Sequence, residues 1–406
     1  MGRVKAWRTV HLTLLKNPIQ TYAWGSRSVI ASLEGRAVPS DEPEAELWIG
    51  AHPSAPSLVL GNSDPTPLPQ WIAARSSPCL GAAEAELGSR LPFLLKVLAA
   101  AQPLSLQAHP NAEQARAGFE AEERAGVPRD APHRCYRDDS HKPELLCALT
   151  EFDALCGFRP VAETSALLRQ LADPELDVLA ERVVEPDGLR GVFQGLYALG
   201  DGARKALVNR TLAACRRQAA KASFADSFMW ALRLAELYPG DIGVVTSLLL
   251  NVLRLQPGQA IYLPAGNLHA YLEGAGVEIM ASSDNVLRGG LTVKHVDVPE
   301  LMKVLDFRPL VPAPVSVIAQ DGRQRYETPA REFCLERVEL VETLELRRAR
   351  PGPEIWLCLE GEASVAAAGE EQPISRGQAV FVCASAGALS LRGNAVLYRA
   401  LVGALA

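Results

Sequence analysis

Two strand-rich regions separated by a long helical block constrain the fold of this chain most strongly. From residue 162 to about 255 the apolar residues recur every three or four positions, as in Leu167, Leu168 and Leu171. This spacing is typical of amphipathic helices, and we expect it to continue through 243–253. On both sides of the block, short apolar segments bounded by Gly and Pro predict strands. We therefore expect a mainly β protein with an α-helical insertion.

The segment from residue 327 to the end reads almost entirely as short strands. Glycines punctuate it at intervals of 6 to 10 residues, at Gly361, Gly369, Gly377, Gly387 and Gly393. Regular spacing of this kind is typical of a small β-barrel or jelly roll. In addition, the sequence GQAVFV from Gly377 echoes GQAIYL from Gly258. This echo indicates two related barrels, which a length of 406 residues accommodates.

The charge pattern and the cysteines narrow the functional class. The formal net charge is −6 without a long basic run, so a nucleic-acid partner is not expected. The longest apolar stretch, 91–101, contains Lys96 and is far shorter than the roughly 20 residues of a membrane span. The N-terminus lacks the pattern of a signal peptide, and the eight cysteines contain no C-x-x-C pair. We expect a monomer with free thiols in the cytoplasm, without membrane partners.

The strongest local motif runs from Gly258 to His269 and reads G-x5-P-x-G-x2-H. Gly258 permits a turn, the apolar run that follows predicts a strand, and Pro264 with Gly266 predicts a second sharp turn. His269 then begins another strand and can point into a barrel. The motif resembles the second motif of the cupin superfamily, in which that histidine binds a metal. The alternative is a histidine that follows a turn and has no role in a site.

Two other motifs offer further metal ligands. Gln107 and His109 are two residues apart, so on a strand both side chains face the same side. The segment DDSHKPE supplies a carboxylate, from Asp139 or Glu144, and the pattern alone leaves that choice open. Two nitrogen and two oxygen ligands suit Zn²⁺ or another borderline divalent ion. Taken singly, each motif also fits hydrogen-bonded core residues or a solvated loop.

A fourth motif lies between residues 276 and 294. Glu278 is on a predicted strand, and Asp284, Arg288 and Lys294 follow in a loop that contains two adjacent glycines. Arginine is well suited to bind phosphate or a developing enediolate, and lysine adds a mobile positive charge. The alternative is a surface hairpin without a functional role.

Together these motifs resemble the type I phosphomannose isomerase family. The segments that carry the resemblance occur in family order from Trp24 to about Lys294: AELWIGAHPSAPS, LQAHPN, DDSHKPEL, ALTEFDALCGFRP and YLPAGNLHAYLEGAGVEIMASSDNVLRGGLTVKH. The resemblance implies one Zn²⁺ per chain, although other divalent metals are possible. It implies the ligand set Gln107, His109, Glu144 and His269.

The resemblance also implies an architecture of two cupin-type jelly-roll barrels plus a helical subdomain. We expect a metal-binding catalytic barrel from 1–160 and 256–326, a helical insertion at 161–255 and a C-terminal barrel at 327–406. Cys383 stands where the metal-binding motif has its proline, and the histidine of that motif is missing there. We therefore expect the C-terminal barrel to be free of metal.

The implied activity is the interconversion of mannose 6-phosphate and fructose 6-phosphate through a cis-enediol. Candidates for proton transfer are Lys142, His141, Asp284 and Glu278, and the resemblance favours the first three without choosing among them. Arg288 would stabilise the anionic intermediate. Candidates for holding the sugar or its phosphate are Ser105, Trp24, Tyr271 and Lys294. Two alternatives are a cupin dioxygenase, which usually has the H-x-H pattern rather than Gln-x-His, and a non-catalytic sugar-phosphate-binding cupin.

Overall fold

The computed structural model describes residues 10–61, 64–218 and 223–405. Residues 1–9, part of the N-terminus in which we saw no signal peptide, lie outside the described residues. The chain divides into two compact units. Unit 1 contains the described parts of Met1–Ala99, Val277–Ser282 and Val315–Ala406, and unit 2 contains Ala100–Gly276 and Ser283–Pro314.

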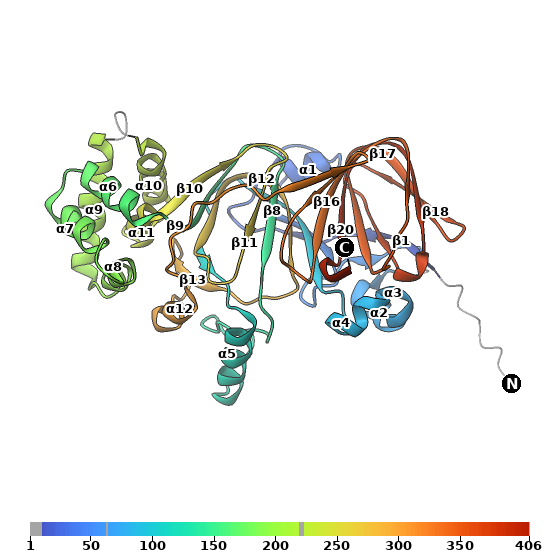
Figure 1. Ribbon diagram of the computed structural model, residues 1–406, viewed down its shortest axis with the longest axis horizontal. Coiled ribbons are helices and arrows are strands. Elements are labelled where there is room, and N and C mark those ends of the chain that lie inside the picture. The colour runs from blue at the N-terminus through green and yellow to red at the C-terminus, as the bar shows by residue number, and fades with distance from the viewer. Residues whose placement is uncertain (1–9, 62–63, 219–222, 406) are drawn as a thin grey trace. The chain divides into compact units, whose positions relative to one another are not determined.

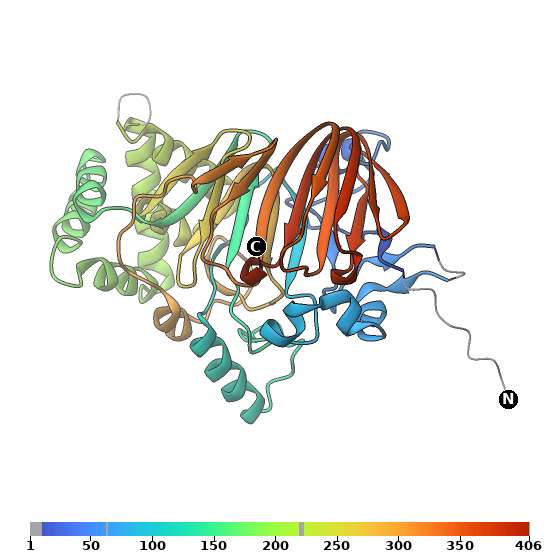
Figure 2. The same cartoon turned by 45° about the vertical axis from the view of Figure 1, so that its right-hand side comes forward.

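Unit 1 is built around an antiparallel sheet whose longest strands are β16, β17 and β20. Their ribbons run side by side (Figures 1 and 2), and β16 pairs with β20 from Cys334↔Leu401 to Leu346↔Leu389. One face packs around Trp356, which is fully buried, because alternate residues of each strand turn inward. The sheet contains β1 (Leu12–Lys16), β4 (Leu58–Val59), β5 (Thr66–Pro67), β14 (Val317–Gln320), β15 (Arg323–Tyr326), β16 (Cys334–Leu346), β17 (Glu354–Ala367), β18 (Glu370–Ser375), β19 (Ala379–Val382) and β20 (Leu389–Leu401).

Strands from both ends of the chain meet in this sheet. Leu12 of β1 is the ladder partner of Val382 of β19, although we had assigned residues 1–160 to the other barrel. A local sequence pattern predicts that a strand exists but does not name its partner, because pairing depends on distant residues. The expected ranges 1–160 and 256–326, 161–255 and 327–406 stay a prediction.

The remaining elements of unit 1 are short helices and a second group of strands. The helices are α1 (Val29–Leu33), α2 (Leu68–Ala73), α3 (Ser76–Leu80) and α4 (Ala82–Leu87). The strands are β2 (Ile19–Gln20), β3 (Glu46–Gly50) and β6 (Phe93–Ala100). β2 pairs with β3, which pairs with β6.

The two similar GQA segments also have similar backbone structures. Gly258 (φ 87°) and Gly377 (φ 85°) both have a left-handed conformation that favours glycine, and each precedes a four-residue strand, β11 (Ala260–Leu263) and β19. In both turns the glutamine that follows the glycine accepts a hydrogen bond of 2.9 Å from the main-chain nitrogen three residues before it. The same turn therefore introduces a strand in each unit.

Unit 2 combines strands with the helical block. β9 (Phe152–Phe158) pairs with β10 (Leu250–Leu255) and with β12 (His269–Ala281), β8 (Glu144–Ala148) pairs with β11, and β13 (Leu287–Gly290) pairs with β7 (Leu106–Ala108). The helices of residues 161–246 gather beside β9 and β10 (Figure 1). They are α6 (Val161–Gln170), α7 (Pro174–Arg182), α8 (Gly188–Tyr197), α9 (Asp201–Gln218), α10 (Ala225–Leu237) and α11 (Gly243–Thr246).

The helical prediction was wrong at its C-terminal end. We expected a helix through 243–253, but the chain leaves the helical conformation after Leu249 and forms β10. Its ladder with β9 buries Leu250 and Leu255. A short apolar run does not distinguish a buried strand from a buried helix, so tertiary pairing decided between them.

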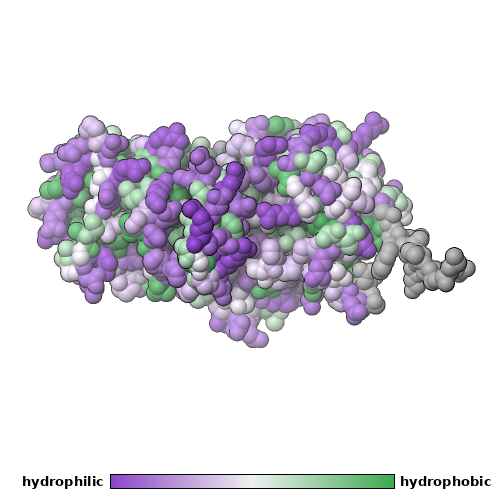
Figure 3. Space-filling view, turned by 90° about the horizontal axis from the view of Figure 1, so that it is seen from below, coloured by the Kyte–Doolittle hydropathy of each residue, from purple (hydrophilic) through white to green (hydrophobic). Residues whose placement is uncertain are grey.

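Helix α5 (Ala112–Arg124) begins after Asn111, which forms a capping box with Gln114. All eight cysteines are buried and free. No helix in the described ranges is both long and apolar enough to span a bilayer. On the face drawn in Figure 3, hydrophilic side chains prevail and hydrophobic ones form small scattered groups.

Candidate metal centre

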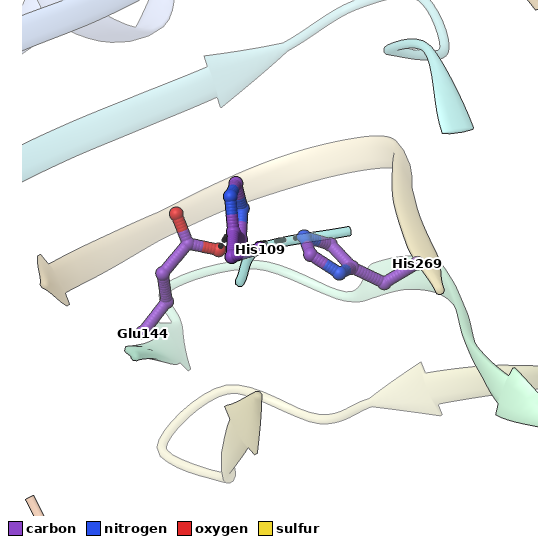
Figure 4. Close-up of side chains that lie close together, drawn as sticks. All are labelled: His109, Glu144 and His269. Carbon is purple, nitrogen blue, oxygen red and sulfur yellow. Dashed lines mark ion pairs between the residues drawn. The ribbon is translucent and has the colours of Figure 1, made fainter. Parts of the chain in front are cut away.

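Three buried side chains of unit 2 point their polar atoms at one another (Figure 4). The carboxylate oxygen Oε2 of Glu144 lies 3.4 Å from Nε2 of His109 and 3.4 Å from Nε2 of His269. None of these three atoms has a hydrogen-bond partner among the described residues. Buried polar atoms left without partners are destabilising, so their convergence indicates a site for a cation.

The strand registers bring these side chains together. Glu144 begins β8 opposite Leu263, the last residue of β11. The turn at Pro264–Gly266 follows, and the main-chain nitrogen of Gly266 (φ 77°) donates to the main-chain oxygen of His109 at 2.8 Å. His269 then begins β12. The glycine turn predicted from the sequence therefore ties the two histidines to each other through the backbone.

Each imidazole has its other nitrogen at a main-chain carbonyl. His109 Nδ1 lies 2.7 Å from the oxygen of Asn285, and His269 Nδ1 lies 3.0 Å from the oxygen of Asn267. A carbonyl only accepts, so Nδ1 carries the hydrogen in both rings and donates it. Each Nε2 is left with a lone pair directed at the centre of the cluster, which is the arrangement of metal-ligating histidines.

The electrostatics of the cluster favour ligation. Burial lowers the pKa of His109 to about 4, so the ring is neutral near pH 7. Burial opposes ionisation of Glu144, yet its interaction with His109 and the charge of the Lys142 ammonium lower the pKa of that carboxyl well below its usual value, so one proton fewer is held by the pair and the carboxylate is ionised. A neutral imidazole and an ionised carboxylate are the forms that bind a metal.

The separations of the carboxylate oxygen from the two histidine nitrogens fit a tetrahedral zinc ion. Zinc bonds of about 2.0–2.1 Å at tetrahedral angles place neighbouring ligand atoms about 3.3 Å apart. The two nitrogen–oxygen separations here are both 3.4 Å. Gln107, on β7, is the ladder partner of His269 and is half-buried, so its amide oxygen is the fourth candidate ligand that the sequence named.

Two predicted basic residues lie beside this cluster. Lys142 is buried, and its Nζ is 3.2 Å from Oε1 of Glu144, the oxygen that faces away from the histidines. Arg288 is half-buried on β13 and is the ladder partner of Gln107. Lys142 thus places a positive charge directly beside the cluster, and Arg288 lies on the strand next to Gln107.

The other predicted residues of unit 2 occupy different settings. Ser105 is half-buried just before β7, and Lys294 is exposed. His141 and Asp284 are half-buried, and the main-chain nitrogen of Asp284 donates to Asp138 at 2.7 Å. Tyr271 is buried, and its ring packs against that of Phe152, with 5.3 Å between the ring centroids.

Two predicted residues belong to unit 1. Trp24 is half-buried and stacks on Tyr22 at 5.7 Å. Glu278 is buried in the second half of β12, where it accepts from Lys96 at 2.9 Å. Lys96 also contacts Glu46 at 3.2 Å, so one ammonium is shared by two carboxylates.

Sequence reasoning missed two residues that contact predicted site residues, one in each unit. Lys96 was noted only as an interruption of an apolar run, although a single charge in a buried strand signals a buried partner. Asn285 is fully buried and contacts both His109 and the loop that precedes Glu144. An asparagine in a loop carries no sequence signal that distinguishes it from an ordinary turn residue.

Comparison with known proteins gives one consistent result. Residues 12–161 match the catalytic domain of type I phosphomannose isomerase. The mannose-6-phosphate isomerase of Escherichia coli (strain K12) is 36% identical over 391 residues, which is 95% of this chain and 98% of the relative.

Solved structures agree with the sequence comparison. A variant of phosphomannose isomerase from Salmonella typhimurium superposes with a TM-score of 0.89 at 34% identity, covering 97% of this chain and 100% of the relative. A zinc-bound mannose 6-phosphate isomerase gives a TM-score of 0.88 at 34% identity, with the same coverage. The chain belongs to the type I phosphomannose isomerase family.

Proposed function

We propose that this chain is a zinc-dependent isomerase that interconverts mannose 6-phosphate and fructose 6-phosphate. One observation carries the proposal: in a member of this family, the unpaired atoms of His109, Glu144 and His269 converge at the spacing of zinc ligands. A relative with the same fold is a zinc-bound mannose 6-phosphate isomerase. The proposed ligand set is Gln107, His109, Glu144 and His269.

A bound zinc ion would polarise the substrate carbonyl and stabilise negative charge on its oxygen. The protein must then move a proton between C2 and C1 of the open-chain sugar through a cis-enediol. Lys142 is supported by its place beside Glu144, with Nζ 3.2 Å from Oε1. His141, Asp284 and Glu278 stay as alternative bases, because a base is assigned by its reach to the carbon acid.

The remaining roles follow from charge and position. Arg288 would stabilise the anionic intermediate, since it is half-buried on the strand that neighbours Gln107. Ser105, Trp24, Tyr271 and Lys294 would hold the sugar or its phosphate. We further propose that the enzyme is a monomer of the cytoplasm without nucleic-acid or membrane partners. The net charge of −6 supports the absence of a nucleic-acid partner, and the free cysteines support a reducing compartment.

The test combines metal analysis with a coupled isomerase assay. Purified protein should contain about one zinc per chain and convert mannose 6-phosphate to fructose 6-phosphate. Chelation should abolish turnover, and added zinc should restore it. A non-catalytic sugar-phosphate binder would bind the substrate without turnover, and a dioxygenase would consume oxygen. Either result with metal-loaded protein would contradict the proposal.

A further inference from the structure

The two adjacent glycines that follow Arg288 form an irregularity in strand β13. The ladder of β13 with β7 pairs Arg288 with Gln107 and then Gly290 with Leu106. Gly289 is therefore an extra residue between two consecutive pairs. Such a β-bulge leaves its extra residue out of the ladder, bends the strand and sets where neighbouring side chains point. This bulge comes directly after the arginine that we propose to stabilise the intermediate.

The register before the bulge places Arg288 in line with two candidate metal ligands. Gln107 is the ladder partner of Arg288 on one side and of His269 on the other. Side chains of ladder partners lie on the same face of a sheet, so these three side chains leave the sheet on one face. A slip of one residue would turn Arg288 to the opposite face. The bulge must therefore hold its place if the arginine is to stay beside the ligands.

A tyrosine of the helical insertion holds the bulge. The hydroxyl of Tyr197, the last residue of α8, donates a hydrogen bond to the main-chain oxygen of Gly289. Burial raises the pKa of Tyr197, so the phenol keeps the hydrogen that it donates. Its ring stacks on that of Phe193 with 4.5 Å between the centroids, and Oγ1 of Thr246 lies 3.2 Å from the phenol oxygen. Packing and a second hydrogen bond thus keep the phenol in place.

The insertion also contacts the chain immediately after the bulge. Asp241 accepts hydrogen bonds from the main-chain nitrogens of Gly243 at 2.7 Å and Thr292 at 3.2 Å. At Gly290 (φ 120°) a Cβ atom would lie 3.0 Å from Oδ1 of Asp241 and 3.1 Å from Cα of Gly243. Glycine permits this backbone and this close approach. The end of α8 and the residues that begin α11 therefore contact β13 at adjacent positions.

We propose that Tyr197 is a positioning residue for Arg288. Its hydroxyl fixes the carbonyl of the bulged residue, and the fixed bulge keeps the arginine on the face of the metal ligands. The inference rests on the proposed function, in which Arg288 stabilises the anionic intermediate. Phenylalanine in place of Tyr197 keeps the ring that stacks on Phe193 and removes only the hydroxyl.

The experiment compares zinc-loaded wild type with Tyr197→Phe, Arg288→Ala, the double variant and the control Ser165→Ala. Ser165 is buried in the same insertion, and its hydroxyl donates to the main-chain oxygen of Ala180 at 2.7 Å. The control therefore loses a comparable hydrogen bond, between α6 and α7. Steady-state kinetics gives kcat and KM, and hydrogen exchange measures the backbone of residues 287–292.

Tyr197→Phe should lower kcat by about tenfold and leave KM and zinc content unchanged, because a misplaced arginine weakens only the stabilisation of the transition state. In the Arg288→Ala background the same substitution should change kcat by less than about twofold, since no arginine is left to position. Residues 287–292 should exchange faster in Tyr197→Phe. Ser165→Ala should match wild type in kcat and in the exchange of this segment.

A normal kcat in Tyr197→Phe, or the same loss in the Arg288→Ala background, overturns the inference. An equal loss of kcat in Ser165→Ala also overturns it, because general loosening of the insertion would then explain the effect. The proposed function fails separately, if wild type with bound zinc has no isomerase activity. In that case faster exchange of residues 287–292 in Tyr197→Phe alone supports the contact that holds the bulge, and unchanged exchange refutes it.

Discussion

The main-chain oxygen of Asn285 lies 2.7 Å from Nδ1 of His109, and it fixes which nitrogen of that ring is free to bind a metal. The Asn285 side chain meanwhile holds the loop of residues 137–140 through four hydrogen bonds to main-chain groups, the nitrogens of Arg137 and Asp138 and the oxygens of Asp138 and Ser140. Metal ligand and loop therefore cannot shift independently. The same loop leads directly to Lys142 and Glu144.

Asn285→Ala should reduce zinc affinity and raise KM for mannose 6-phosphate. The substitution leaves buried main-chain groups of the loop without partners, at a cost of about 1–3 kcal/mol in the free energy of unfolding. Zinc titration, substrate kinetics and thermal unfolding would measure the three effects.

Asn251→Ala is the matched control for Asn285→Ala. Asn251 is also buried in unit 2, and its side-chain nitrogen donates to three main-chain oxygens, of Cys156, Gly157 and Leu310. This variant should lose comparable stability and retain zinc affinity. Equal loss of zinc affinity in both variants would show that general destabilisation, rather than positioning, explains the effect.

His269→Ala should lose both bound metal and isomerase activity while the chain stays folded. The substitution removes one ligand atom from the cluster, so zinc should no longer bind. The lost Nε2 atom has no hydrogen-bond partner in the metal-free protein, so its removal breaks no hydrogen bond there. Zinc content by mass spectrometry and circular dichroism would test this. The control is His11→Ala, in unit 1, whose ring contacts only Ser385 in the described part of the chain. One equivalent of zinc retained in His269→Ala would remove His269 from the ligand set.

Arg288→Ala should keep its zinc and lose at least about two decades of kcat, because it removes a charge that stabilises the transition state. Steady-state kinetics with zinc analysis would separate the two properties. Arg233→Ala removes an exposed arginine of unit 2 that pairs with Glu273, and it should have no effect on turnover. Near-normal kcat in Arg288→Ala would contradict the role given to this side chain.

Glu354→Gln should strongly destabilise unit 1. The carboxylate accepts from Arg399 at 2.6 and 2.8 Å and from Arg348 at 2.7 Å, and all three side chains are buried. Removing one member of a buried ion pair leaves an uncompensated charge, which costs about 3–5 kcal/mol. Urea unfolding at pH 7 would measure the loss. The exposed pair of Glu339 and Arg337 supplies the control Glu339→Gln, with an expected change of about 0–1 kcal/mol.

The effect of Glu354→Gln should depend on pH with a defined sign. Burial opposes ionisation of Glu354, but Arg399 and Arg348 hold its pKa below the ordinary value of 4.5. A carboxyl whose pKa is lower in the folded state adds stability above its unfolded pKa and loses it as the pH falls through the folded pKa. The difference between wild type and variant should therefore shrink below about pH 4.5. A difference that grows on acidification would contradict this pairing.

The sequence predicted those parts of the fold that have a local physical cause. Repeated apolar spacing indicated the helices of residues 161–246, because side chains three and four residues apart share one face of a helix. Glycine and proline indicated the turn before His269, because few other residues adopt that backbone. The family motifs named His109, Glu144 and His269, whose side chains converge in space, although their roles stay a proposal.

Tertiary structure alone decided what depends on contacts between distant residues. It made β10 a strand by pairing it with β9, and it placed β1 beside β19. It also selected Asn285 as the residue that holds both a histidine and a loop, and it placed Arg288 on the strand beside Gln107. The physical reason is the same in each case. A side chain's hydrogen-bond partners and its electrostatic environment are set by the residues that pack near it and not by its immediate neighbours in sequence. The two contacts of Asn285 with Arg137 and His109 join residues 148 and 176 positions apart along the chain.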